Sequence, residues 1–285
     1  MNAQLHSHRT EAGRVMPAIA VDPRRAAVVT LMIGGYIALG FAFGLGAEAY
    51  LLLGIPITIA FQMLVVRRPL RSLWLRQAPP MTFSPRSVVA IVVLAIAPAI
   101  VAASGFRDGN IALLGWGLAS MVGAVGAVYA LRAMDRAAVR STIRTTLITG
   151  AVLVVIMVAY RIATGGFNGN LAAAITTCAI SLATYLPVVF VMEEVLFRGL
   201  IDTYLHGPTP GPDRATALYG SALWGLWHLP VAFLALGVFT IPYLVIVHTT
   251  IGYFLVTSWR RTGNLAAPGI AHAVIDALRN AVAVF

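Results

Sequence analysis

Charged residues divide the chain into long apolar segments that contain no Asp, Glu, Lys or Arg. Five such segments are Ala26–Ala47, Ala49–Val66, Ser87–Phe106, Gly109–Leu131 and Thr145–Tyr160. A helix needs about 20 predominantly apolar residues to cross a bilayer. Only 11% of the residues are charged, whereas soluble domains average about 25%. The sequence therefore predicts an all-α, polytopic integral membrane protein.

The remaining apolar sequence predicts four further spans. Ile162–Met192 holds one helix after a loop at Thr164–Asn170, and Ala215–Trp259 holds two helices broken around Gly237–Pro242. A last helix begins near Leu265, which gives about nine transmembrane helices. We expect residues 1–160 to form an N-terminal cytoplasmic tail with five accessory helices, and residues 161–285 to form a separate C-terminal core.

The positions of the arginines predict the orientation of the chain in the membrane. If the N-terminus is cytoplasmic, sixteen arginines fall in cytoplasmic segments and two fall outside, as the positive-inside rule requires. The Arg67–Arg86 segment, with four prolines, is then a cytoplasmic loop with an interfacial turn. The formal charge of +10 is spread over these gaps instead of forming one patch, which argues against nucleic-acid binding. Cys178 is the single cysteine, so an intramolecular disulfide is excluded.

Three ionisable residues lie deep in an apolar stretch, at Glu193, Glu194 and Arg198. Each charge in hydrocarbon costs at least about 2.5–3.5 kcal/mol, and such residues usually mark a cavity, an ion path or a catalytic centre. On a helix, Glu194 and Arg198 face each other at i,i+4, while Glu193 points about 100° away. We expect Arg198 to neutralise Glu194 and Glu193 to face a cavity. The alternative is that both carboxylates share Arg198.

Two further i,i+4 pairs lie on later helices. Trp224 and His228 share one face, where the indole could wall the imidazole, and Pro230 favours a kink there. His272 and Asp276 share another face, although Arg279 could instead pair with Asp276. At 1.5 Å per residue, Glu193, His228 and His272 lie at comparable depths from the cytoplasmic side. His248 has no patterned neighbour, and we interpret it as a core histidine outside the site.

These three patterns resemble the CPBP family of intramembrane proteases, also called the ABI family, which includes the type II CAAX prenyl endopeptidases. The family's motifs are Glu-Glu-x-x-x-Arg, Phe-x-x-x-His and His-x-x-x-Asn, in that order on separate helices. They correspond here to Glu193–Arg198, Trp224–His228 and His272–Asp276. The resemblance covers roughly Leu171 to Asn280. Trp224 replaces the usual Phe, and Asp276 replaces the usual Asn, which leaves the role of the fourth residue open.

The resemblance implies an intramembrane endopeptidase that cleaves near the cytoplasmic membrane face. Glu193 would act as general base on a water molecule, with His228 helping to hold and activate that water. His272, with Asp276, would stabilise the oxyanion or protonate the leaving amine. Glu194 and Arg198 would hold the frame, with Trp224 as an aromatic wall. We expect a multi-pass protein of a bacterial inner membrane, acting within the lipid bilayer on a membrane-associated peptide or protein.

Two alternatives remain open from the sequence. A metal-dependent variant would use His228, His272 and Glu193 as ligands, with zinc as the possible ion. We expect no cofactor and no metal, because a Glu and two imidazoles can activate water unaided. The other alternative is a non-catalytic membrane protein, such as a bacteriocin-immunity factor or a proton-coupled transporter that uses the carboxylates as a relay.

Overall fold

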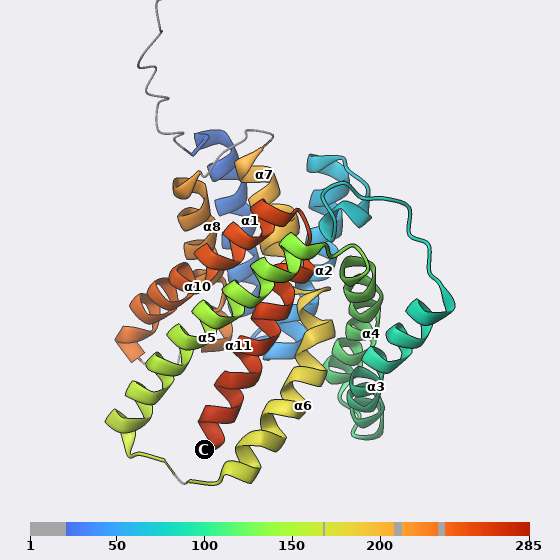
Figure 1. Ribbon diagram of the computed structural model, residues 1–285. Helices are drawn as coiled ribbons and strands as arrows, with labels where there is room; N and C mark the ends of the chain where they lie inside the picture. The colour runs from blue at the N-terminus through green and yellow to red at the C-terminus, as the bar shows by residue number, and fades with distance from the viewer. Residues whose placement is uncertain (1–20, 168, 208–212, 233–236) are drawn as a thin grey trace, which may run out of the picture.

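The computed structural model describes residues 21–167, 169–207, 213–232 and 237–285, which form a bundle of helices (Figure 1). The long helices are α1 (Pro23–Ala42), α2 (Ala47–Phe61), α3 (Pro85–Arg107), α4 (Ile111–Leu131), α5 (Arg136–Thr164), α6 (Leu171–Val189), α8 (Arg214–Trp227), α10 (Thr240–Thr262) and α11 (Ala266–Val284). The short ones are α7 (Thr203–His206), α9 (Leu229–Ala232), the π-helical η1 (Gln62–Val66) and η3 (Val195–Asp202), and the 3-10 turns η2 (Leu70–Leu73) and η4 (Gly237–Phe239). The described residues contain no β-sheet; Leu75 and Asn264 form an isolated bridge.

Each of the nine predicted spans corresponds to one long helix, so the all-α, polytopic fold is confirmed. Seven helical segments are long and apolar enough to cross a membrane, by length and composition. They are α1, α2 with η1, α3, α4, α5, α6 and α10. The 14-residue α8 is too short by this measure, and α11, which carries His272, Asp276 and Arg279, is not among the seven. A total of nine crossings stays a prediction.

Polar caps set several helix boundaries. Asp135 accepts a hydrogen bond from the Ala138 amide at 2.7 Å and starts α5 nine residues before the predicted apolar run. The helix thus extends beyond the apolar segment into an arginine-rich stretch. Asn170 accepts from the Ala173 amide at 2.9 Å and starts α6, so the loop predicted between α5 and α6 is confirmed.

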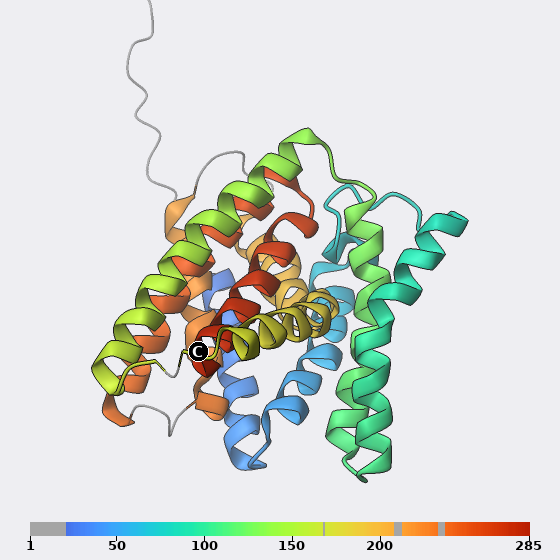
Figure 2. The ribbon, with the colours of Figure 1, turned by 60° about the horizontal axis from the view of Figure 1, so that its bottom comes forward.

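The helices that carry the predicted site residues lie side by side. Figure 1 shows α11 between α5 and α6, and α8 packs along α10. Gly225 permits this second contact, because a Cβ there would lie 2.5 Å from the Leu244 carbonyl oxygen on α10. The hairpin of α3 and α4 forms the opposite edge from α5 and α10 (Figure 2). Helices of the C-terminal half that are far apart in the sequence therefore lie side by side.

The loop between η1 and α3 packs into the bundle. It contains η2, which confirms the predicted turn, and it buries Leu73 and Leu75. The indole Nε1 of Trp74 donates to the Phe190 carbonyl at 2.7 Å, and the Leu265 amide donates to the Trp74 carbonyl at 2.9 Å. The loop consequently holds the end of α6 and the start of α11 at fixed positions.

We expect a cysteine at Met81, in a Cys178→Ala background, to react with a membrane-impermeant thiol reagent only from the cytoplasmic side. Met81 is exposed, and its loop belongs to the arginine-rich segments of the topology prediction. An Arg107→Cys variant, at the exposed end of α3, should react only from the opposite side. The measurement is labelling of intact cells and of inverted vesicles. Labelling of Met81→Cys in intact cells would show that the chain has the opposite orientation in the membrane.

Candidate active site

The two adjacent glutamates lie just after a break in the chain's helical path. Helix α6 ends at Val189, a turn follows, and helical structure resumes at Glu193 and runs to His206 through η3 and α7. The η3 segment is π-helical, and π-helical segments, which are rare in proteins, are frequent at functional sites. The helical conformation that the sequence analysis assumed for Glu194 and Arg198 is therefore present, with a break before it that the sequence did not predict.

Glu194 and Arg198 form the predicted i,i+4 pair. Nε of Arg198 lies 3.4 Å from Oε2 of Glu194, and both side chains are almost completely buried. The guanidinium also stacks on Trp224, with its central carbon 4.3 Å from the ring centroid. The other oxygen of Glu194, Oε1, lies 2.8 Å from Nδ1 of His272. Glu194 therefore connects the η3 segment to α11, a contact that the sequence did not predict.

Glu193 faces three aromatic side chains. Its Oε2 accepts a hydrogen bond from the indole Nε1 of Trp224 at 3.1 Å. The same oxygen lies 3.8 Å from Nε2 of His228 and 3.8 Å from Nε2 of His272. The ion pair of Arg198 is with Glu194, so the arrangement follows the predicted division between the two glutamates. Trp224 is more than an aromatic wall, because its N–H contacts the carboxylate.

The His228 ring is fixed by the end of α8. Its Nδ1 lies 2.8 Å from the Trp224 carbonyl oxygen, and since a carbonyl can only accept, Nδ1 carries the proton. In the neutral ring Nε2 is then an acceptor that faces Glu193. Helix α8 ends at Trp227, before Pro230, which confirms the predicted interruption. The His228 side chain is 19% exposed, against 9% for Glu193 and 4% for His272, so His228 marks the more open side of the site.

Asp276 has two partners. Its Oδ2 lies 3.6 Å from Nε2 of His272, and its Oδ1 lies 3.1 Å from Nη1 of Arg279. Both contacts considered from the sequence are therefore present. Because Nδ1 of His272 is held by Glu194, the Nε2 side of that ring is shared between Glu193 and Asp276.

The structure places a further histidine beside the site. The His248 ring lies against His228, with centroids 4.2 Å apart, and against Trp224, with centroids 4.7 Å apart. Its Nδ1 is bound to the Leu244 carbonyl at 2.8 Å, so Nε2 is free to accept in the neutral ring. The sequence interpretation left this residue out. Gly225 was the available signal, because a glycine between Trp224 and His228 allows α10 to approach closely.

Within the part of the chain that the structure describes, one group of side chains could hold a metal ion. Glu193, His272 and Asp276 each offer a ligand atom, and these atoms lie within 4.8 Å of one another. This set shares Glu193 and His272 with the ligands considered from the sequence but contains Asp276 in place of His228. Two carboxylate oxygens and one imidazole with an open position are a donor set that suits zinc.

All seven residues predicted for the site converge in the structure. They come from the η3 segment, the end of α8 and the first half of α11. The residues predicted to be catalytic are Glu193, His228, His272 and Asp276, and those predicted to support them are Glu194, Arg198 and Trp224. Three carboxylates, two histidines and one guanidinium thus form one polar centre inside an apolar bundle, and all of them except His228 are buried.

A comparison with protein families gives a match that covers the site. Residues 174–278 match the family described as type II CAAX prenyl endopeptidase Rce1-like. The match includes all three motifs and confirms the resemblance found in the sequence. It supports a multi-pass membrane protease of the CAAX endopeptidase type. Neither the comparison with curated proteins nor the comparison with solved structures gives a match.

Proposed function

We propose that this Rce1-like chain is an endopeptidase that hydrolyses a peptide bond near the cytoplasmic membrane face, with water activated by Glu193 and His228. The observation that carries the proposal is the convergence of two imidazole nitrogens on one carboxylate oxygen, Oε2 of Glu193, at 3.8 Å each. At this separation, the carboxylate oxygen of Glu193 and an imidazole nitrogen can both contact the same water molecule. The substrate is a membrane-associated peptide or protein.

Glu193 and His228 act on the two protons of the water. Both side chains present hydrogen-bond acceptors to the water. Glu193 offers a carboxylate oxygen, and His228 offers the Nε2 lone pair, since its Nδ1 donates to the Trp224 carbonyl. A water held by two acceptors directs its oxygen lone pair towards the substrate. As the oxygen attacks the scissile carbonyl carbon, Glu193 takes one proton. When the C–N bond breaks, this proton passes to the leaving amine.

His272 acts on the carbonyl oxygen of the substrate. Glu194 accepts from Nδ1 and fixes the ring, so that Nε2–H of the protonated ring can donate to the developing oxyanion. Asp276 lies beside the same nitrogen and balances the charge of the ring, and Arg279 balances Asp276. This assignment gives Asp276 an orienting role that an Asn would fill through its amide.

The proposal is tested by comparing membrane peptides from cells that carry the wild type and cells that carry Glu193→Ala. New peptide termini should occur only with the wild type. Glu48→Ala, which removes a carboxylate at the start of α2 outside the site, should leave the peptide profile unchanged. Identical profiles for the wild type and Glu193→Ala would contradict a protease function and favour the non-catalytic alternative.

We expect the activity to persist without a bound metal. Purified enzyme, dialysed against a strong chelator, should keep most of its activity on a reporter peptide, because a carboxylate and two imidazoles supply acceptors and a donor unaided. Elemental analysis should find well under one zinc per chain. Asp276→Asn should keep substantial activity, because the amide can still hydrogen-bond to His272.

Loss of activity on chelation, restored by zinc, would contradict this expectation. In that case the ligands would be Glu193, His272 and Asp276, whose donor atoms already lie together. Asp276→Asn would then lower zinc occupancy, since an amide oxygen is a weaker ligand than a carboxylate.

A further inference from the structure

A cavity of about 980 Å³ opens where the ends of several helices meet. Its walls come from α1, η1, the loop before α3, the η3–α7 segment, the start of α8 and the end of α10. None of the seven predicted site residues lines it. Six arginines do: Arg25, Arg68, Arg76, Arg214, Arg260 and Arg261.

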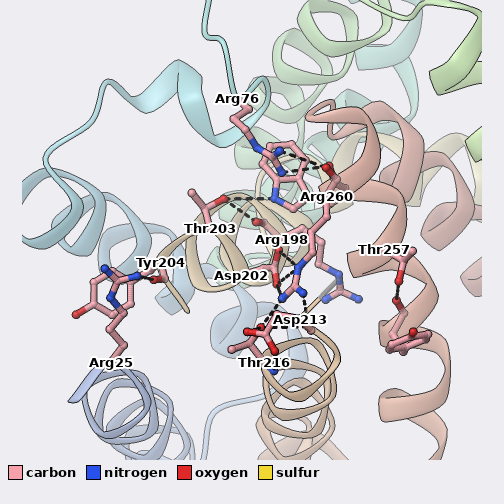
Figure 3. A network of polar contacts seen from close by, with 12 residues as sticks. Arg25, Arg76, Arg198, Asp202, Thr203, Tyr204, Asp213, Thr216, Thr257 and Arg260 are labelled. Carbon is pink, nitrogen blue, oxygen red and sulfur yellow. Dashed lines mark hydrogen bonds and ion pairs between the residues drawn. The ribbon is translucent and has the colours of Figure 1, made fainter. Parts of the chain in front are cut away.

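The floor of the cavity is an internally balanced network (Figure 3). Arg260 contacts Asp202 through two nitrogens, at 2.6 and 3.0 Å, and donates to Thr216 at 2.8 Å. Arg76 donates to the Arg260 carbonyl at 3.2 Å. Asp213 caps α8 by accepting from the Thr216 amide. These contacts position the floor and leave little charge there.

The rim carries positive charge that the protein does not neutralise. Arg68, Arg214 and Arg261 are exposed, and within the described residues none of their guanidinium groups has a hydrogen bond or an ion pair. His206 adds no charge at neutral pH, since burial and, to a smaller extent, the Arg260 guanidinium lower the pKa of its imidazole. Six guanidiniums, against the carboxylates of Asp202 and Asp213 and that of Asp22, which lies 3.6 Å from Arg25, leave a net charge of +3 around the cavity.

The positive-inside rule explains arginines at helix ends but not their convergence on one cavity. Arg136 and Arg140, at the start of α5, satisfy the same rule while exposed outside the cavity. Guanidinium groups match phosphate oxygens through paired N–H donors. Basic pockets between helices on the cytoplasmic side are known sites for lipid phosphate groups.

We propose that this cavity binds a phosphate group, and that the phosphate belongs to the headgroup of an anionic phospholipid. Apolar residues next to the cavity support a lipid source. Val65 and Val66 of η1 line it, and the neighbouring Met63 and Leu64 are 58% and 70% exposed, as side chains that face lipid are. A headgroup in the cavity can therefore keep its acyl chains against η1.

The test uses the full chain purified in a neutral detergent. Phosphatidylglycerol, phosphatidylcholine and inorganic phosphate are titrated separately, and binding is read from native mass spectra and from the thermal midpoint. We expect saturable binding of phosphatidylglycerol and an increase in the thermal midpoint. The Arg214→Gln/Arg261→Gln variant should bind it at least about tenfold more weakly, because two rim charges are lost. The control, Arg136→Gln/Arg140→Gln, removes the same charge outside the cavity and should bind as the wild type does.

The three titrations distinguish the possible sources of the phosphate group. Tighter binding of phosphatidylglycerol than of inorganic phosphate supports the lipid source. Equally tight binding of inorganic phosphate alone overturns the lipid source. Equal weakening in both double variants, or equal binding of phosphatidylcholine, overturns the site itself, since either result means diffuse attraction to charge or to lipid. None of the four arginines is part of the proposed catalytic machinery, so these outcomes are independent of peptidase activity.

Discussion

Glu193→Gln is expected to lower the rate of peptide cleavage by about 10²–10⁴-fold, the range that a general base contributes. The amide keeps the size of the carboxylate and can still accept from the Trp224 N–H, but it cannot take a proton from water. The amount of folded protein should stay near that of the wild type. The measurement is single-turnover cleavage of a reporter peptide by purified variants, with thermal midpoints taken on the same samples.

Trp224→Phe is the matched comparison for this variant. It keeps an aromatic ring, the side chain usual in the family motif, and removes the N–H that contacts Glu193. We expect a smaller loss of activity than in Glu193→Gln, because the base remains while its orientation loosens. Full activity in Glu193→Gln together with an inactive Glu194→Gln would show that the roles of the two glutamates are reversed.

Glu194→Gln is expected to lower stability strongly, by about 3–5 kcal/mol, the cost of breaking a buried ion pair. The change leaves the Arg198 guanidinium uncompensated in a fully buried position. It also weakens the contact of Glu194 with Nδ1 of His272. Fluorescence-detected size exclusion in detergent should show a smaller folded fraction, and the thermal midpoint should fall.

A double variant separates the two consequences of this change. Glu194→Leu/Arg198→Met removes both charges, which often restores stability when a buried pair is replaced by apolar side chains. The folded fraction should recover, while cleavage stays low because His272 has lost the partner of its Nδ1. A thermal midpoint of Glu194→Gln equal to that of the wild type would contradict the structural role of the pair.

The helices could be predicted from the sequence because local rules determine them. Charged residues separate the apolar runs, and each predicted span corresponds to one long helix. The Glu194–Arg198 and His272–Asp276 contacts followed from i,i+4 spacing. The boundary of α5 was wrong by nine residues, because helix propensity and the Asp135 cap extend a helix past its apolar part.

Contacts between distant segments could not be predicted in this way. Glu194 and His272 are 78 residues apart, and their contact depends on how α11 packs beside η3. His248 meets His228 only because Gly225 lets α8 and α10 approach closely. The hydrogen bond from Trp224 to Glu193 depends on the ring orientation, which no spacing determines.

The turn around Trp74 extends the functional unit beyond residues 174–278, which match the family. Its indole holds Phe190, three residues before Glu193, and its carbonyl holds Leu265, seven residues before His272. The spacing of Glu193 and His272 is therefore set partly by a loop of the N-terminal half. A chimera that exchanges the C-terminal helices has to carry this loop with them, since its hydrogen bonds join it to both segments.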